Sequence, residues 1–154
     1  MQQVPDSTVN GNDMFSTLSA TAEQSPDPGV STDATKQVAS ALFHEAAVDR
    51  DVTAFDRYAA DPYHQHNPQS PNGTAAAKEQ FTSAFAAYPD LGISVKRVIA
   101  EGDYAAIHHH FKPAAEDLGS AVIDIFRVQD GKVVEHWDVI QPVPATSAND
   151  NTMF

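Results

Sequence analysis

The second half of the chain is a series of strand-like segments separated by turn signals, and this pattern limits the folds that the chain can adopt. Runs rich in β-branched and aromatic residues cover residues 93–100, 104–111, 120–128 and 132–141. The turn pairs Gly102-Asp103 and Asp130-Gly131 separate neighbouring runs, and an Asp-Gly pair in such a place is a strong signal for a β-hairpin. The pattern predicts an antiparallel sheet with short connections.

The first half has helical periodicity instead. Three possible N-caps at 31–33 predict the start of a first helix. Asp51 is expected to cap a second helix that ends at Asp61-Pro62, because the residue before a proline disfavours the helical conformation. A short edge strand over 63–68 and a third helix over 74–88 follow. Helices followed by a strand meander predict an α+β fold whose helices cover one face of a curved sheet.

A chain of 154 residues has room for one domain with one core. We expect that domain over residues 31–144. Residues 1–30 are rich in Ser, Thr, Asn, Asp, Gln and Pro, which predicts a flexible N-terminal arm. Residues 145–154 form a turn-rich C-terminal tail.

The net charge of −12 argues against nucleic acid or an anionic membrane surface as the partner, because both would repel the chain. No apolar stretch approaches the length of a membrane span. The first 15 residues lack the basic start and apolar core of a secretory signal, so we expect a cytoplasmic protein. With no Cys, thiolate chemistry is excluded. A small molecule is the expected partner.

Four segments resemble the SnoaL-like branch of the nuclear-transport-factor-2-like superfamily. They are YHQHNP (63–68), RVIAEGDYAAIH (97–108), VIDIFRVQDGKVVEHWDVIQPVP (122–144) and the terminal NDNTMF. The resemblance covers roughly residues 33–154. It implies a cone formed by a strongly bent sheet and closed by three helices, with a pocket inside and a homodimer formed through the sheet.

The resemblance also implies a chemistry. In the polyketide cyclases of this branch, an Asp late in the last strand is a general acid/base on an enolisable substrate, and no metal takes part. The cyclase aspartate falls where this chain has Val139, Ile140 and Gln141, whereas its own carboxylate, Asp138, directly follows Trp137. Our hypothesis is that Asp138 is the acid/base residue, with no cofactor.

Alternation along the last strand decides which side chains accompany Asp138. His136 and Asp138 share one face, while Glu135 and Trp137 share the other. We expect His136 and Asp124, from the preceding strand, to tune or orient Asp138 as catalytic partners. Whether Asp124 lies on the same face depends on the hairpin turn.

Two turns are compatible with the sequence. A two-residue turn at 130–131 would place Asp124 opposite Trp137, and a three-residue turn at 129–131 with a Gly bulge would place it opposite His136. We favour the second, because it forms a polar cluster against an apolar wall, as small-molecule pockets do. The cluster and wall are Asp124, His136, Asp138, Phe126 and Val134. The same register leaves an apolar outer face, formed by Ile123, Ile125 and Val133, for the homodimer.

Seven histidines are many for a chain of this size, and five lie in strand-like segments. A histidine beside a carboxylate can pass protons near neutral pH. His109 has the opposite parity from His108 and His110, and we expect it to be structural. The expected substrate contacts are His66, Tyr63, His108, His110, Trp137, Phe81 and Phe85.

Alternatives remain at each candidate. Asp124 would be structural if it paired with Arg97 or Arg127, and Tyr63 if it only packed against the helices. Histidines and a carboxylate would also suit zinc or iron, although we predict no metal. The preferred function is a cyclase, isomerase or aldol/lyase-type enzyme for a small enolisable carbonyl compound. The alternative is a non-catalytic ligand-binding or interaction module, because the fold serves both roles.

Overall fold

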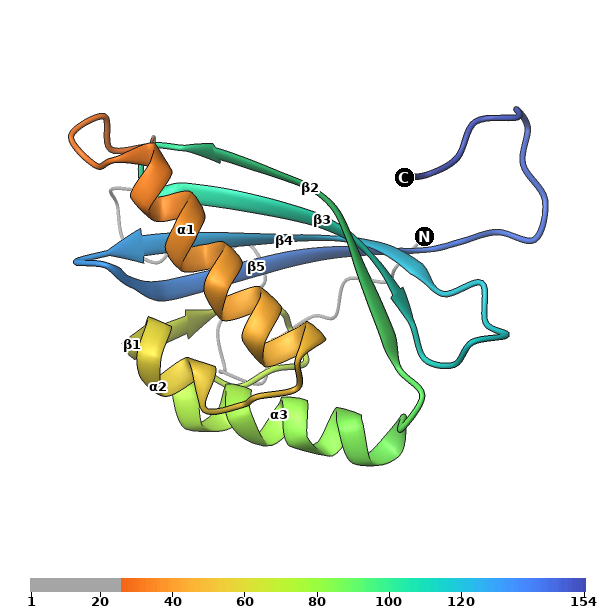
Figure 1. Ribbon diagram of the computed structural model, residues 1–154, viewed down its shortest axis with the longest axis horizontal. Helices are drawn as coiled ribbons and strands as arrows, with labels where there is room; N and C mark the ends of the chain where they lie inside the picture. The colour runs from red at the N-terminus through yellow and green to blue at the C-terminus, as the bar shows by residue number, and fades with distance from the viewer. Residues whose placement is uncertain (1–25) are drawn as a thin grey trace.

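A computed structural model describes residues 26–154 as a five-stranded sheet with helices packed against one face (Figure 1). Residues 1–25, most of the expected N-terminal arm, lie outside the described residues. The elements in chain order are α1 (Thr32–Phe43), the π-helical turn η1 (His44–Val48), α2 (Ala54–Tyr58), β1 (Ala59–Gln65), α3 (Thr74–Ala87), β2 (Gly92–Glu101), β3 (Tyr104–Lys112), β4 (Ser120–Gln129) and β5 (Lys132–Pro142).

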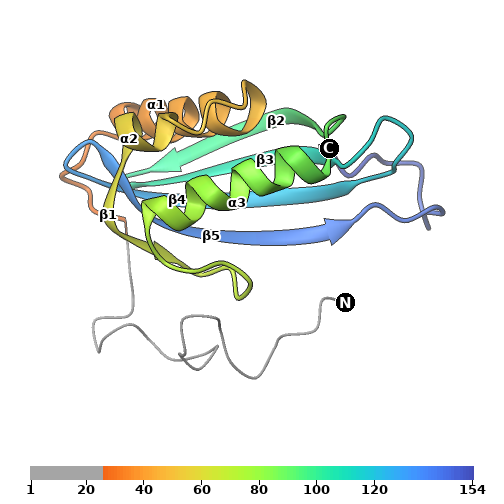
Figure 2. The same cartoon turned by 90° about the horizontal axis from the view of Figure 1, so that it is seen from below.

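The strands lie in the order β1-β5-β4-β3-β2, and the sheet is curved and open. Neighbours are antiparallel except for β1, which runs parallel to β5. Figure 2 shows α1 and α2 on one side of the sheet, and residues of α1 and α3 line one cavity against this side. We call this side the inner face and the opposite side the outer face. The predicted α+β class, with a curved sheet and three helices, is confirmed.

The helices begin and end where local chemistry favours it. The Ser31 side chain caps α1 by accepting a hydrogen bond from the Ala34 backbone N–H at 3.3 Å. The other end of α1 places Leu42 and Phe43 in the core, where they are 2% and 6% exposed. They lie in one apolar cluster with Ile107 of β3 and Phe126 of β4. Burying each such side chain stabilises the fold by about 1.5 to 3 kcal/mol.

The β4–β5 hairpin corrects our favoured turn. Asp130 and Gly131 have φ angles of 52° and 72°, as a tight two-residue turn requires, and the three-residue turn is therefore wrong. The extra residue lies in β5 instead: Val134 is a bulge, after which Arg127 pairs with Glu135.

The bulge places Asp124 opposite Asp138, not opposite His136 or Trp137. The difference from the favoured register is two residues, so the parity of the side chains is unchanged. Asp124, His136 and Asp138 share the inner face.

One expectation for the outer face also fails. Val133 pairs with Val128 across the tight turn and is fully buried in the core, at 0% exposure. Ile123 does lie on the outer face, where it is 42% exposed. The outer face is therefore apolar without Val133. Within residues 26–154, no helix has the length and apolar character needed to span a membrane.

Candidate functional site

A cavity of about 280 Å³ lies between the helices and the inner face of the sheet. Two residues expected to contact the substrate, Phe81 and Phe85 of α3, line it. Further apolar lining comes from Phe55, Ile93, Phe111 and Ile140. Such a cavity is at the small end of the range for ligand pockets and suits a compact, largely apolar molecule.

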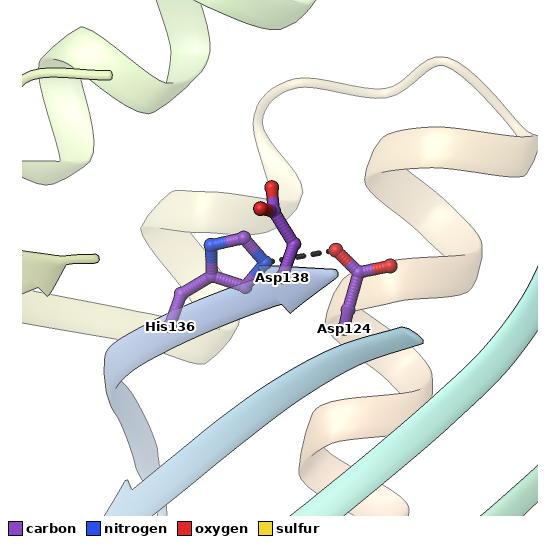
Figure 3. A group of neighbouring side chains, drawn as sticks. All are labelled: Asp124, His136 and Asp138. Atoms are coloured by element: carbon purple, nitrogen blue, oxygen red, sulfur yellow. Dashed lines mark hydrogen bonds and ion pairs between the residues drawn. The ribbon is translucent and has the colours of Figure 1, made fainter. Parts of the chain in front are cut away.

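Three polar residues on neighbouring strands line the same cavity. Figure 3 shows Asp124 on β4 and His136 and Asp138 on β5, with their side chains on the same side of the two strands. They come together because Asp124 and Asp138 are directly paired across the strands and His136 is two residues from Asp138. All three were expected to form the catalytic group.

Asp124 is held as a buried carboxylate by two histidines. His109 Nε2 lies 2.7 Å from Oδ2, and His136 Nε2 lies 2.8 Å from Oδ1. Burial opposes ionisation, but the hydrogen bonds from His109 and His136 outweigh it, so the pKa of Asp124 lies below its ordinary value. Both oxygens are occupied, and Asp124 pairs with neither Arg97 nor Arg127. This carboxylate is suited to fixing its neighbours rather than to exchanging protons.

His136 lies between two polar partners. One ring nitrogen faces the Asp124 carboxylate, and Nδ1 lies 2.8 Å from Gln65 Oε1. The Asn67 backbone N–H donates to the same Gln65 atom at 3.0 Å, which identifies that atom as the amide oxygen. The ring of His136 is therefore held between Asp124 and Gln65.

Asp138 is in a different state from Asp124. The Asn67 side-chain amide donates to Asp138 Oδ2 at 2.6 Å. Burial raises the pKa of Asp138 above its ordinary value; the hydrogen bond from Asn67 and the charge of His136 act against this, and the charge of Asp124 adds to it. A carboxyl group with a raised pKa beside an apolar cavity is suited to accepting and returning a proton.

Tyr63 of β1 brings a phenol to the same cavity. It is 3% exposed, lines the pocket and packs edge-to-face on Phe55 with 6.0 Å between ring centroids. Burial raises its pKa strongly, and the negative charges of Asp124 and Asp138 add to this. Among residues 26–154, its hydroxyl forms no hydrogen bond. The phenol is therefore protonated and available to a ligand.

Asp124, His136 and Asp138 are also the residues that come closest to a metal site in the described part of the chain. Their possible ligand atoms lie within 4.8 Å of one another. His136 Nε2 and Asp124 Oδ1 are 2.8 Å apart, at hydrogen-bond distance. A cation held by these three residues would replace this hydrogen bond with two ligand bonds.

Two expected substrate contacts, His66 and Trp137, are not part of the pocket lining. The His66 ring stacks on Trp137 with centroids 4.5 Å apart, and its Nε2 lies 2.8 Å from Glu135 Oε1. Arg127 Nε donates to the other Glu135 oxygen at 2.6 Å. Because residues alternate along β5, Glu135 and Trp137 face outward when His136 and Asp138 face inward. His66 follows β1 and lies with this outer group.

The histidines of β3 lie on the faces of the sheet opposite to those that we expected. His109 lines the pocket, whereas His108 and His110 lie on the outer face. There they stack on the ring of the C-terminal Phe154, with centroids 5.7 and 4.2 Å away.

Sequence reasoning missed six polar residues that line the pocket. They are Gln65, Asn67, Ser70, Gln80, His109 and Ser120. The sequence did hold a signal for His109. Ile107 and Phe111, the large apolar residues of the strand, lie on the same face as His109, which indicates that this face is the buried one. Ser70 lies in a turn-rich loop, and no pattern in the sequence indicates that its side chain is buried.

The family follows from comparison with known proteins. A model of the SnoaL-like domain matches residues 40–136, more than half of the chain, and the chain belongs to this family. Among curated proteins, no sequence matches.

Solved structures share the fold at low sequence identity. A proposed ketosteroid isomerase from Kribbella flavida is 18% identical, with a TM-score of 0.63 over 77% of this chain and 85% of that one. An NTF2-like protein from Mesorhizobium loti is 21% identical, with a TM-score of 0.63 over 76% of this chain and 98% of that one. A proposed SnoaL-like polyketide cyclase from Jannaschia is 18% identical, with a TM-score of 0.61 over 75% of this chain and 91% of that one. These similarities establish the nuclear-transport-factor-2-like fold.

Proposed function

We propose that the chain is an enzyme of the cyclase, isomerase or aldol/lyase type that acts on a small, largely apolar, enolisable carbonyl compound. The observation that carries the proposal is a carboxyl group with a raised pKa, Asp138, in one apolar cavity with the phenol of Tyr63, which has no hydrogen-bond partner in the described residues. A base and a hydrogen-bond donor in a cavity of low polarity are what enolate chemistry needs.

The reaction begins with proton transfer to Asp138. Its carboxylate removes a proton from the carbon next to the carbonyl group. The electron pair of that C–H bond forms the C=C bond of an enolate, and the C=O pair moves to the oxygen. In an isomerisation, protonated Asp138 returns the proton to another carbon. In a cyclisation, the enolate carbon attacks a second carbonyl carbon and the new alkoxide takes the proton.

The neighbouring residues have separate roles in this proposal. The Tyr63 hydroxyl donates a hydrogen bond to the developing enolate oxygen. The hydrogen bond from Asn67 and the charge of His136 lower the pKa of Asp138 against the effect of burial, which keeps the carboxyl group able to ionise. Asp124 holds His136 in place at 2.8 Å and balances its charge.

The non-catalytic binding module remains the alternative function, and the state of the carboxylates discriminates between the two. In a binding module we expect both carboxylates to be tied up by partners. Asp124 meets that description, since His109 and His136 each lie at hydrogen-bond distance from one of its oxygens. Asp138 is bound by the neutral amide of Asn67, which leaves it able to change protonation state. This difference favours the enzyme.

The test follows enolisation directly and needs no knowledge of the natural substrate. Exchange of the α-protons of 1-tetralone, a compact bicyclic ketone, is measured by NMR in D2O. We expect the wild type to accelerate exchange, and Asp138→Asn to lower the catalysed rate about 10²-fold or more. Asp150→Asn, which changes an exposed aspartate of the tail, is the control and should exchange at the wild-type rate.

Two results would contradict the proposal. One is an Asp138→Asn protein with the wild-type exchange rate. The other is a wild type that binds the ketone without accelerating exchange, which would favour the binding module.

We also propose a homodimer that pairs the outer faces of two sheets. Ile99 is 65% exposed, Ile123 42% and Val139 63%, so apolar side chains from three strands lie uncovered on one surface. Light scattering at micromolar concentration should give a dimeric mass, and Val139→Glu should give a monomer. A monomeric wild type, independent of salt, would contradict this assembly.

A further inference from the structure

The side-chain amide of Asn67 is held at both of its ends. Its Oδ1 accepts a hydrogen bond from the Gln69 backbone N–H at 2.9 Å. Because a backbone N–H can only donate, this contact identifies the oxygen of the amide, and the other end, Nδ2, is the one that donates to Asp138 Oδ2 at 2.6 Å. Turning the amide over would break the first bond and set an acceptor against a carboxylate. The Asn67 side chain therefore presents its donor to Asp138 in one orientation.

The backbone of Asn67 is fixed by the same loop. Its N–H donates to Gln65 Oε1 at 3.0 Å, and its carbonyl oxygen accepts from the Ser70 N–H at 3.0 Å. The preceding residue, His66, donates its backbone N–H to the His136 carbonyl oxygen at 2.9 Å, which ties the start of the loop to β5. All four polar groups of Asn67 are bonded, so contacts within the chain set the position of its amide.

The two oxygens of Asp138 differ as a result. Oδ2 accepts the bond from Asn67, and among the described residues Oδ1 has no hydrogen-bond partner. Oδ1 is not one of the buried unpartnered atoms of residues 26–154, so it keeps accessible surface. Asp124 shows the other case, since each of its oxygens lies at hydrogen-bond distance from a histidine. With Oδ2 anchored, Oδ1 is the oxygen of Asp138 that is left for a proton.

Four strands bring titratable groups to Asp138. They are Asp124 from β4, His136 from β5, His109 from β3 and Tyr63 from β1. Burial raises the pKa of Asp138, and the hydrogen bond from Asn67 is the largest of the effects that lower it. The charges of His136 and His109 also lower this pKa, and the charge of Asp124 raises it. Removing the Asn67 donor should therefore leave less of the ionised base at a given pH.

We propose that Asn67 is a positioning residue that anchors Oδ2 of Asp138 and thereby assigns the exchange of the proton to Oδ1. The anchoring is independent of any reaction, whereas the role of Oδ1 rests on the proposed function. A carboxylate held at one oxygen keeps the other in place between turnovers, which orients the base for its substrate. The contribution of Asn67 is thus to geometry and to the pKa of Asp138, and Asn67 itself transfers no proton.

Two substitutions separate the donor from the turn that holds it. Asn67→Asp has the shape of the wild-type side chain and keeps an oxygen for the Gln69 N–H, but it places a second carboxyl oxygen against Asp138. Asn67→Ala removes both contacts. Asn72→Ala is the control, because Asn72 Oδ1 accepts from the Gln65 backbone N–H at 2.8 Å in the same loop and Asn72 is not among the residues that line the cavity.

NMR titration of the Asp138 carboxyl carbon in the full chain, without ligand, measures the anchoring. The signal is identified by its absence in Asp138→Asn. We expect Asn67→Ala to move the midpoint of this titration up by about one pH unit, because the ionised form loses a hydrogen bond. In Asn67→Asp the two carboxyl groups titrate as a pair, and the second proton should leave at a still higher pH. Asn72→Ala should keep the wild-type midpoint.

A wild-type midpoint in Asn67→Asp would overturn the proposal, because the donor would then have no effect on Asp138. So would a midpoint in Asn72→Ala that is raised as far as that of Asn67→Ala, which would assign the effect to the loop as a whole. Thermal unfolding is measured for each variant. If Asn67→Ala destabilises the fold, Asn67→Asp decides, since it keeps the bond to Gln69.

The pH profile of α-proton exchange in 1-tetralone tests the link to the reaction. In both Asn67 variants the rise of the rate with pH should move to higher pH together with the titration of Asp138. A profile that stays at its wild-type position while the titration midpoint moves would overturn the role of Oδ1. A wild type that does not accelerate exchange would contradict the proposed function and the role of Oδ1 with it, while the titration would still decide whether Asn67 anchors Asp138.

Discussion

Glu135 and Asp138 lie three residues apart on one strand, on opposite faces of the sheet, and their carboxyl groups have opposite pKa shifts. Burial opposes ionisation of both. At Glu135 the hydrogen bonds from His66 and Arg127 outweigh burial, and the pKa is lowered. At Asp138 the hydrogen bond comes from Asn67, and the pKa is raised. The charge of the partner, not burial alone, separates a fixed carboxylate from one that can exchange protons.

The largest expected effect is on stability, and it comes from the outer pair. Arg127→Gln removes the cation from Glu135, which is 2% exposed, and leaves it with His66 alone. Breaking a buried ion pair from one side costs about 3 kcal/mol. Urea unfolding should show this loss, while Asp138→Asn should stay within about 1 kcal/mol of the wild type. A larger loss in Asp138→Asn than in Arg127→Gln would reverse the comparison.

The next largest effect is expected in Tyr63→Phe, which should lower the rate of α-proton exchange without lowering the free energy of unfolding. Tyr63→Phe removes the proposed donor to the enolate oxygen and should slow α-proton exchange by about 10- to 100-fold. Because the Tyr63 hydroxyl has no partner within the described residues, its removal should not lower the free energy of unfolding. Exchange rates and urea unfolding of the same preparation test both parts. Slower exchange explained entirely by unfolding would place Tyr63 with the structural residues.

The two carboxyl groups should also give opposite dependences of stability on pH. The pKa of Asp138 is raised from 3.8, so its contribution to stability is present below that pH and lost as the pH rises through the raised value. As the pH rises through this pKa, the wild type loses this contribution and Asp138→Asn does not. The stability of Asp138→Asn relative to the wild type should therefore increase with pH. The pKa of Glu135 is lowered from 4.5, so its contribution is present above that pH and lost on acidification.

Thermal unfolding between about pH 3 and pH 7 measures both dependences. The difference in Tm between Glu135→Gln and wild type should shrink on acidification, because the wild type loses its ionised carboxylate. Differences that change in the same direction for both variants would contradict the assignment of opposite shifts.

The smallest effect is expected at the C-terminus. The ring of Phe154 stacks on His110 at 4.2 Å on the outer face, and Lys96 Nζ lies 5.2 Å from its centroid. Phe154→Ala should cost about 1 kcal/mol or less and leave α-proton exchange unchanged. A loss of exchange activity would mean that the outer face influences the pocket.

The sequence predicts most elements of this fold because their signals are local. The end of the second helix is an exception: α2 ends at Tyr58, and Asp61-Pro62, where we expected the helix to end, lies within β1. The caps before α1, the start of α3 at Thr74 and the turn pairs between strands are all where the sequence places them. The bulge at Val134 has no local signal, since an extra residue in a strand is set by pairing across the sheet. It changed the partner of Asp124 but not its face, because the error was an even number of residues.

The site was predicted less completely than the fold. Asp124, His136 and Asp138 share a face by alternation alone, which a sequence shows. Asn67 and Ser70 reach the pocket through a loop whose path depends on tertiary packing. The parity of β3 was misjudged because the number of histidines was given more weight than the apolar residues on the side of His109.

The bulge at Val134 also separates the bend of β5 from the pairing of its reactive groups. The residues before it, in the turn, pair as in a regular hairpin, and those after it keep Asp124 opposite Asp138. Removing Val134 would join these two ladders without changing any pairing, whereas the bend that a bulge introduces would be lost. The loss of one residue here would therefore straighten the strand and leave Asp124 and Asp138 opposite each other.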